Sequence, residues 1–465
     1  MPGERVDRRH LLRLTGSATA ATLAGCTRWI GDTDSAVGGT IEVNPADALV
    51  DEPLEIVLSE AEPNEQLTVW ARTDDDHGQT WLSFGHYETD TNGALDLADH
   101  SPISGTYERN DPNGLLWSLR VPDGPEVPFL EGDAHEIEFI VQRDDTTIAT
   151  TEITRRFVDP GVSQHPVDED GISGIFFDPA DSDPHSGVLV LHCSEGAIPW
   201  LYGAMLASRG YATLALQYFS PIGEDGLPEE LVGVPLEYCK QALDWLLDQP
   251  AVAGDQIGVV GASKGGELAL LLGATYPAIG AVVGYVPSGV VWEGLSFEGE
   301  VGSSWSYEGQ DVPYVPIEFD ADAESLGAMV DGIRGQPVSL TSSYRTPLDL
   351  PADDRVVEAT IPVERIDGPV VLISGTEDAL WPSTELSEIA MHRLEEHDHA
   401  YPSAHLVYEG AGHLINIPYQ PTTHFDAFEF MPGFTMAMGG TPADNARAAA
   451  DSWPRVLGVL EEGLR

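Results

Sequence analysis

A serine stands between two glycines where an apolar run gives way to a helical pattern. The β-branched run IGVV (257–260) is followed by GASKG (261–265) and then by an Ala/Leu-rich segment. A serine hydroxyl becomes a useful nucleophile when a base removes its proton and a strained turn presents it to the substrate. Glycine on either side allows a strand and a helix to meet in such a turn. Ser263 is therefore a candidate nucleophile, and the alternative is an ordinary helix N-cap.

Two later segments supply an acid and a base in the chain order of α/β-hydrolases. Asp378 lies just past the apolar run of VVLISGTEDALWP (370–382), and His413 follows AHLVY (404–408), behind a Gly-Ala-Gly that would free the loop. Both positions fall at the ends of strands, where such a site assembles. We expect His413 to act as general base and then as the acid that protonates the leaving group. Asp378 would hold the imidazole tautomer and stay ionised.

Other residues compete for these two roles. Glu377 is the second candidate for the acid, but it lies one residue nearer the strand. His192, His405 and His424 are rivals for the base, although none combines a strand end with the glycine context, and His405 lies at the start of its strand. The alternative for His413 is an ordinary histidine of a surface loop.

The developing oxyanion needs backbone N–H donors beside the nucleophile. We expect one from Lys264, directly behind Ser263, and another from Ser194 or Glu195 in the loop HCSEGAIPW (192–200). Lys264 is one of only two lysines in the chain. For its side chain, exposure at a helix start is the ordinary expectation.

The cysteine spacing argues against a metal centre. Cys26, Cys193 and Cys239 form no paired pattern of the kind that binds zinc, and three cysteines make no disulfide framework. Cys193 in an apparently buried strand and Cys239 in an amphipathic helix are expected to be small core residues. We expect no metal ion and no cofactor.

After residue 160, apolar segments alternate with helical patterns, which is typical of a mostly parallel sheet covered on both faces. Residues 230–250, for example, repeat large apolar side chains at three- and four-residue steps and predict an amphipathic helix. We therefore predict an α/β-hydrolase domain with a doubly wound sheet over 161–465. Its aromatic-, Gly- and Pro-rich stretch 288–363 predicts a lid or substrate pocket over the carboxyl ends of the strands.

Residues 40–160 contain about seven short strand-like segments separated by Asp, Asn, Pro and Gly turns. One of these segments is GLLWSLRV (114–121). The spacing is typical of an immunoglobulin-like β-sandwich. We predict that an all-β domain precedes the hydrolase domain.

The chain is strongly acidic, with 77 Asp and Glu against 22 Lys and Arg and a net charge of −55. The acids are dispersed, so their mutual repulsion opposes a compact state unless salt screens it. At ~1 M salt the Debye length is only about 3 Å. The composition therefore predicts adaptation to high salt, and we expect no nucleic-acid partner. A cationic partner is the alternative explanation, which the dispersed pattern disfavours.

The N-terminus has the features of an export signal. Arg8-Arg9 precedes a short apolar stretch that ends in Leu-Ala-Gly-Cys at Cys26. Twin arginines are typical of folded-protein export, and the stretch is too short to span a bilayer. We predict a signal over 1–25, lipidation of Cys26, a flexible tether over 26–39 and anchoring to the outer face of the cell membrane. An ordinary N-terminal helix is the alternative.

Several long segments resemble, in order, the family of acyl-CoA thioesterases and bile acid-CoA:amino acid N-acyltransferases. The resemblance covers nearly all of the chain after the signal and implies that Ser263, Asp378 and His413 form a triad that takes an acyl group from a CoA thioester. In the amino acid-conjugating members a cysteine occupies the nucleophile position, so the serine implies hydrolysis of a small acyl thioester or ester. The matching segments include GTYERNDPNGLLWSL (105–119), LHCSEGAIPWLYGAMLASRGYATLALQYF (191–219), GASKGGELALLL (261–272), GPVVLISGTEDALWPS (368–383), YEGAGHLINIPY (408–419) and GGTPADNARAAADSWPRVL (439–457).

Two features depart from that family. The loop at 192–194 is His-Cys-Ser where many members have more glycine, and the signal would export the protein although CoA thioesters are intracellular. Other functions therefore stay open. These are acyl transfer to an amine or alcohol acceptor, a general carboxylesterase, and a catalytically silent lipoprotein that binds ligands at the cell surface.

Overall fold

The computed structural model describes most of the chain that follows the predicted signal. The predicted signal (1–25), the lipidation candidate Cys26 and the tether up to residue 37 lie outside the described residues. Within the described residues, no helix is both long enough and apolar enough to cross a membrane. The described ranges are 38–122, 132–169, 171–181, 183–221, 223, 226–296, 299, 301–317, 332, 334–349, 354–424, 426–431 and 434–465.

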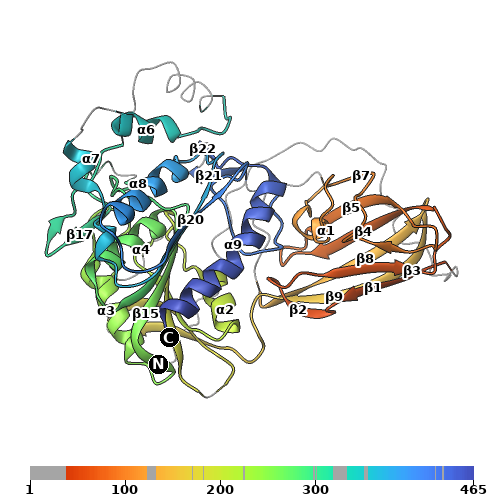
Figure 1. Ribbon diagram of the computed structural model, residues 1–465, viewed down its shortest axis with the longest axis horizontal. Helices are drawn as coiled ribbons and strands as arrows, with labels where there is room; N and C mark the ends of the chain where they lie inside the picture. Colours follow the sequence, from red (N-terminus) through yellow and green to blue (C-terminus); the bar gives the residue numbers. More distant parts are fainter. Residues whose placement is uncertain are drawn as a thin grey trace, which may run out of the picture. The chain divides into compact units, whose positions relative to one another are not determined.

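Two largely antiparallel sheets form the N-terminal part of the described chain (Figure 1). Their strand orders are β1-β3-β6 and β2-β9-β8-β4-β5-β7. Buried and exposed residues alternate along β4 (Gln66–Asp74) because one face of the sheet is covered and the other is solvated. Val69, Trp81 and Phe139 belong to the shared apolar core. The other strands are β1 Thr40–Asn44, β2 Asp47–Leu49, β3 Glu55–Ser59, β5 Thr80–Glu88, β6 Leu95–Asp96, β7 Ser104–Gly105, β8 Ala134–Arg143 and β9 Thr146–Arg156.

One strand predicted in this part is wrong. The segment 114–121 begins with the short helix α1 (Gly114–Trp117), whose four residues are all buried. A strand with one solvated face would instead alternate between buried and exposed positions. The helical turn also places Trp117 Nε1 2.7 Å from Asp111 Oδ2, so the indole N–H is satisfied although the ring is buried.

An eight-stranded sheet of order β10-β11-β13-β12-β15-β16-β19-β20 forms the centre of the C-terminal part. The six strands from β13 to β20 in this order are parallel, whereas β10 and β11 join antiparallel at one edge. The predicted α/β-hydrolase class, preceded by a β-rich part, is confirmed. The strands of the C-terminal part are β10 Ser163–Glu169, β11 Ile172–Asp178, β12 His185–Leu191, β13 Ala212–Gln217, β15 Val252–Ala262, β16 Ile279–Tyr285, β19 Val370–Gly375, β20 Ser403–Tyr408, β21 Ala427–Met431 and β22 Phe434–Ala437.

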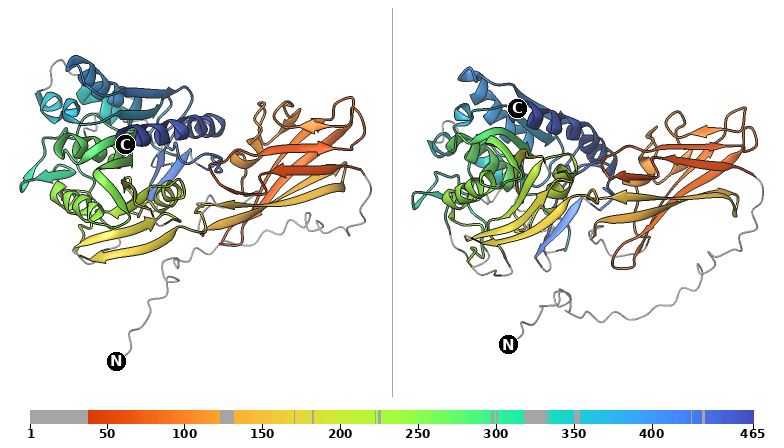
Figure 2. Two further views of the ribbon diagram at one scale, coloured as in Figure 1. Left: turned by 60° about the horizontal axis from the view of Figure 1, so that its bottom comes forward. Right: turned by 90° about the horizontal axis from the view of Figure 1, so that it is seen from below.

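Successive residues of the central strands face opposite helical layers. Val188 and Val190 of β12 belong to the cluster that contains α2 and α9, whereas Leu189 and Leu191 belong to the cluster of α3, α4 and α8. Figure 1 and Figure 2 show these layers on the two sides of the sheet. Because both faces are covered, the strands are continuous apolar runs. The helices are α2 Trp200–Ser208, α3 Leu236–Leu247, α4 Lys264–Thr275, α8 Ser383–Glu396 and α9 Pro442–Gly463, with the 3-10 turn η2 at Val363–Arg365.

The helix predicted over 230–250 is shorter than expected. It begins at Leu236, because the preceding β14 (Val234–Pro235) pairs in parallel with β17 (Trp305–Tyr307). Pro235 has no N–H, and a residue that precedes proline disfavours the helical region. The proline therefore sets the start of α3.

The predicted insert, 288–363, is described in part and contains only short elements in that part. They are β17, β18 (Gln310–Asp311), α6 (Thr341–Asp349) and α7 (Asp354–Ala359). Trp292 and Tyr344 from this stretch form a small apolar cluster with neighbouring side chains. Its role as a lid stays a prediction.

Candidate active site

Ser263 occupies a strained turn between β15 and α4. Its backbone φ is +55° and its ψ is −121°, a conformation that non-glycine residues adopt at a cost and mostly at functional sites. The turn needs both flanking glycines: a Cβ on Gly261 would lie 2.1 Å from the Gly265 carbonyl oxygen, and one on Gly265 would lie 2.3 Å from that of His192. Ser263 is at the N-cap position of α4, yet its hydroxyl makes no capping hydrogen bond.

The hydroxyl instead faces an imidazole and a carboxylate. His413 Nε2 lies 2.9 Å from Ser263 Oγ, and His413 Nδ1 lies 2.9 Å from Asp378 Oδ2. All three residues are buried, with exposures of 3% for Ser263, 5% for His413 and 7% for Asp378. An ionised carboxylate only accepts hydrogen bonds, so Nδ1 carries the proton and Nε2 is free to accept from the serine. The structure thus brings together the three residues that the sequence predicted.

Asp378 is held by the loop that follows β19. Its Oδ1 accepts from the backbone N–H groups of Leu380 at 3.0 Å and Trp381 at 3.2 Å, which leaves Oδ2 for His413. The ring of Trp381 meets the imidazole edge-on, with centroids 6.0 Å apart. Trp381 was not predicted from the sequence as a site residue, although it lies three residues after the acid.

His413 is fixed by close packing between loops. Its backbone N–H donates to the carbonyl of Met438 at 2.8 Å. A Cβ on Gly412 would lie 2.1 Å from the carbonyl oxygen of Gly439, so only glycine permits this approach. The Gly-Ala-Gly before His413 was expected to free the loop, and Gly412 instead lets two loops pack tightly.

The competing acid and bases lie elsewhere. Glu377 is exposed. His405 bonds to Ser374 Oγ at 2.7 Å, and burial lowers its pKa to about 4. His424 packs edge-on against Trp81, with centroids 5.4 Å apart, and burial lowers its pKa to about 4 as well. These residues do not join the Ser263 network.

His192 has a different structural role, at the carboxyl end of β12. Its ring stacks on Tyr218 with centroids 3.7 Å apart, and its Nδ1 lies 2.7 Å from the carbonyl oxygen of Cys193. Its Nε2 accepts from the Tyr218 backbone N–H at 3.3 Å. These contacts define one neutral tautomer, and burial lowers the pKa of His192 to about 3. His192 therefore shapes the loop that follows.

The loop predicted to supply an oxyanion donor lies beside His413. Glu195 is reached by solvent, but the surrounding protein raises the pKa of its carboxyl, while the His413 charge acts in the opposite direction. The backbone N–H of Glu195 is one of the two donors predicted for this loop, and the Glu195 carboxyl lies near Cys193. Ser194 is half-buried in the same loop.

The expectation for the Lys264 side chain is wrong. Lys264 is 2% exposed, and its ammonium lies 3.2 Å from both carboxylate oxygens of Glu267, which is itself fully buried. A lysine at a helix start is exposed only where no other element covers that turn, and here the insert covers it. Glu267 was not identified from the sequence, although its three-residue spacing from Lys264 on a predicted helix was a usable signal.

The cysteines and charged groups do not form a metal site in the described part of the chain. Cys239 is buried in α3, as predicted. Cys193 lies past the end of β12 and is only half-buried, and the surrounding protein and the nearby Glu195 carboxylate raise the pKa of its thiol. The arrangement as a whole suits nucleophilic acyl transfer, since it joins a hydroxyl, a base and an acid beside N–H groups at a helix start.

Two family models match this chain. The model for the BAAT/acyl-CoA thioester hydrolase C terminal matches residues 234–465, and that for the acyl-CoA thioester hydrolase/BAAT N-terminal region matches residues 51–169. The mitochondrial acyl-coenzyme A thioesterase 2 of Homo sapiens is 28% identical over 422 residues, which cover 89% of this chain and 82% of that protein. Acyl-coenzyme A thioesterase 1 of Mus musculus is 29% identical over 426 residues, or 89% of this chain and 94% of that protein.

Proposed function

The chain belongs to the acyl-CoA thioester hydrolase/BAAT family and is a hydrolase, and from this premise we propose that it cleaves an acyl thioester of the acyl-CoA type through an acyl-enzyme on Ser263. The single observation that carries the mechanism is the chain of two 2.9 Å contacts from Ser263 through His413 to Asp378. The names of the relatives support the thioester as the substrate class.

Acylation begins when Ser263 Oγ attacks the thioester carbonyl carbon while His413 Nε2 takes the hydroxyl proton. Collapse of the tetrahedral intermediate breaks the C–S bond, and His413 returns the proton to the departing thiolate. A water molecule then attacks the acyl-enzyme and gives its proton to Nε2. Ser263 Oγ recovers that proton as the carboxylic acid leaves. Asp378 stabilises the imidazolium in both steps.

The negative oxygen of the intermediate needs donors on the side of Ser263 away from His413. The backbone N–H of Lys264 is suited to this role, because the first N–H groups of a helix have no partner within it. The 194–195 loop is the candidate for the second donor. Its Glu195 carboxyl lies within electrostatic reach of His413, and a glycine-rich loop would place no such carboxyl there.

The test is a substrate panel measured in about 1 M salt, so that screening offsets repulsion between anionic CoA and an acidic protein. The wild-type protein should hydrolyse CoA thioesters, and Ser263→Ala should reduce kcat by at least about 10⁴-fold. Mass spectrometry should find the acyl group on the peptide that contains Ser263. Near-normal activity of the folded Ser263→Ala variant would refute the mechanism.

The same panel separates hydrolysis from the alternatives. Activity on oxygen esters alone would remove the thioester assignment and leave the triad standing. Conversion of added glycine or taurine to an N-acyl product would instead show acyl transfer to an amine. Absence of both turnover and fluorophosphonate labelling would favour a silent binding protein.

A further inference from the structure

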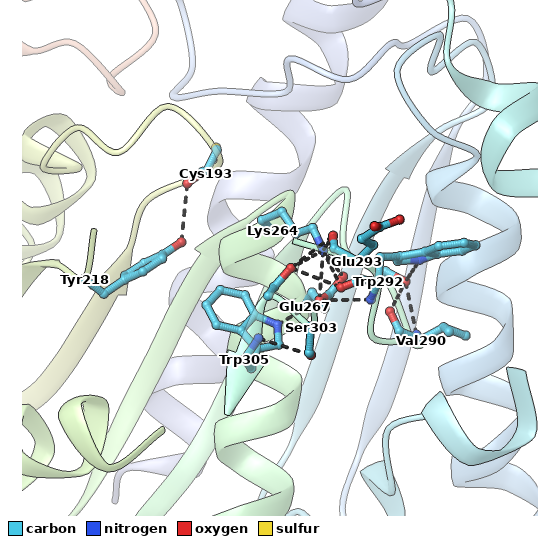
Figure 3. Close-up of polar contacts among 11 residues, drawn as sticks. Cys193, Tyr218, Lys264, Glu267, Val290, Trp292, Glu293, Ser303 and Trp305 are labelled. Carbon is cyan, nitrogen blue, oxygen red and sulfur yellow. Dashed lines mark hydrogen bonds and ion pairs between the residues drawn. The ribbon is translucent and has the colours of Figure 1, made fainter. Parts of the chain in front are cut away.

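The Lys264 side chain leads away from the nucleophile turn into a buried polar cluster. We name the Lys264 cluster by its members, Lys264, Glu267, Trp292, Ser304 and Trp305. Figure 3 shows Lys264, Glu267, Trp292 and Trp305 converging. The Lys264 ammonium lies 2.8 Å from Ser304 Oγ and 3.3 Å from the carbonyl oxygen of Trp292. The Glu267 carboxylate accepts from Trp305 Nε1 at 2.8 Å and from the Trp292 backbone N–H at 3.4 Å.

The cluster joins two parts of the chain that perform different tasks. Lys264 and Glu267 belong to the first turn of α4, whereas Trp292, Ser304 and Trp305 belong to the insert. The side chains of Lys264 and Glu267 are 3% and 0% exposed. A buried ion pair gains little net stability over apolar side chains of similar volume, because both charges lose their water. Stability alone is therefore a weak reason for placing charges here.

The insert also reaches the other half of the site, through aromatic rings in edge-on contact. Trp292 meets Tyr344 at a centroid distance of 4.8 Å, and Tyr344 meets Trp381 at 5.6 Å, both edge-on. Trp381 in turn contacts the His413 ring and donates its backbone N–H to Asp378. Trp292 is thus connected to Lys264 on one side of the site and to the acid–base pair on the other.

We propose that Lys264 is a positioning residue whose side chain, held by Glu267 and by the insert, sets the direction of the Lys264 backbone N–H toward the oxyanion. The proposal rests on the acyl-enzyme mechanism proposed above. The N–H and the side chain leave adjacent atoms of one residue, so anchoring the ammonium restricts rotation of the peptide between Ser263 and Lys264. Displacement of a catalytic donor by about 1 Å can cost on the order of 100-fold in rate.

The test uses Lys264→Met combined with Glu267→Gln, which removes both charges and leaves no unpaired ion. Rates are expressed per active site titrated with a fluorophosphonate. We also measure the Ki of a trifluoromethyl ketone, whose carbonyl carbon bonds to Ser263 Oγ while the proton moves to His413 and the oxygen becomes an alkoxide at the oxyanion site. We expect kcat/KM to fall and Ki to rise by a similar factor, about 10- to 100-fold, with KM changed less than about threefold.

The chain supplies a matched control in its only other lysine. Lys240 pairs with Asp244 at 2.6 Å on the exposed face of α3. Lys240→Met combined with Asp244→Asn removes the same charges from a helix, and it should leave both kcat/KM and Ki unchanged. A loss in this control equal to that in the Lys264 pair would refute the proposal, because the effect would then follow from net charge.

The outcomes are distinct. Wild-type kcat/KM and Ki per titrated site in the double variant would overturn the proposal, and a lower Tm with unchanged kinetics would do so as well. If the double variant fails to fold, Ser304→Ala decides, since it removes one partner of the ammonium with little change in volume; we expect Ki to rise about threefold, and an unchanged Ki overturns the proposal. Failure of the fluorophosphonate to label Ser263 in the wild-type protein would instead refute the proposed function.

Discussion

The N-terminal sheets and the eight-stranded sheet treat charged groups in opposite ways. Among the described strands of the N-terminal sheets, Arg155 of β9 is the charged residue that is buried, and it donates to the backbone carbonyls of Val50 and Glu52. The carboxyl end of the eight-stranded sheet buries Lys264, Glu267, Asp378 and His413 within a few contacts of one another. Burying a charge is costly unless it is paired. The difference teaches that the molecule gathers several buried charges where a hydroxyl must be activated.

The two parts meet through a polar contact that is separate from the site. Asp51, which follows β2, accepts from Arg209 Nη2 and Arg209 Nε at 2.5 and 2.8 Å and from Trp453 Nε1 at 2.7 Å. Arg209 is the C-cap residue of α2, and Trp453 lies in α9. If chemistry and attachment are separate functions, changes at Asp51 and at the triad should affect different measurements.

The largest effect in this comparison is expected from Asp378→Asn. The amide would favour the wrong imidazole tautomer and would not stabilise the imidazolium, so kcat should fall on the order of 10⁴-fold, with little change in Tm. Steady-state kinetics and thermal unfolding check this. The matched control is Glu377→Gln, the exposed neighbour, which should keep wild-type kcat. A larger loss in the control than in Asp378→Asn would identify Glu377 as the acid.

Asp51→Asn is expected to have a smaller effect, and this effect should fall on stability and not on kcat. The change weakens the bonds to Arg209 and Trp453, and it should lower the free energy of unfolding by about 2 kcal/mol. This is less than the loss of a fully buried ion pair would cost, because Arg209 is 28% exposed and solvent screens the pair. The kcat of the folded protein should stay within about twofold. Denaturant unfolding in molar salt measures the first quantity. Asp47→Asn, which breaks the more exposed pair with Arg156, should leave the midpoint unchanged.

If Asp51→Asn reduced kcat per titrated site as strongly as it reduced stability, the separation between attachment and chemistry would be wrong. The N-terminal sheets would then take part in holding the site.

The smallest effect concerns His192, whose pKa burial lowers to about 3 in the folded protein. An unfolded histidine titrates near 6.5, so between these values the unfolded chain binds the extra proton. Stability from this group is complete above about pH 6.5 and is lost as the pH falls, by about 1.4 kcal/mol per pH unit. In His192→Gln the free energy of unfolding should therefore fall less steeply with decreasing pH, by about 1.4 kcal/mol per pH unit. Urea unfolding at pH 6.5, 6.0, 5.5 and 5.0 checks it, and an unchanged slope would contradict the buried neutral state.

Local sequence patterns predicted much of the fold. The apolar runs 257–260 and 370–375 predicted parallel strands because a strand buried on both faces has apolar side chains at every position. The same reasoning from local pattern gave a wrong prediction at 114–121, where the continuously buried residues form the helix α1 and not a strand. It also misplaced the start of α3, which depended on the single proline at 235.

The candidate triad could be predicted because strand ends, glycines and chain order are all visible along the chain. Ser263, Asp378 and His413 each follow a strand of one parallel sheet, and parallel strands end at the same edge. The environment of each side chain could not be predicted in this way. The burial of Lys264 depends on Ser304, 40 residues later in the chain. The Glu195 carboxyl beside His413 lies 218 residues before it.

The sequence by itself therefore determined the type of fold, the family resemblance and the order of the reactive groups, because these depend on short-range periodicity and on residue types. The tertiary structure alone decided that Ser263 bonds to His413 instead of capping its helix, that Lys264 is paired and buried, and that Trp292 connects both halves of the site. Such contacts depend on distant segments whose approach is settled only when the whole core packs. The order of the motifs along the chain does not specify how these segments pack.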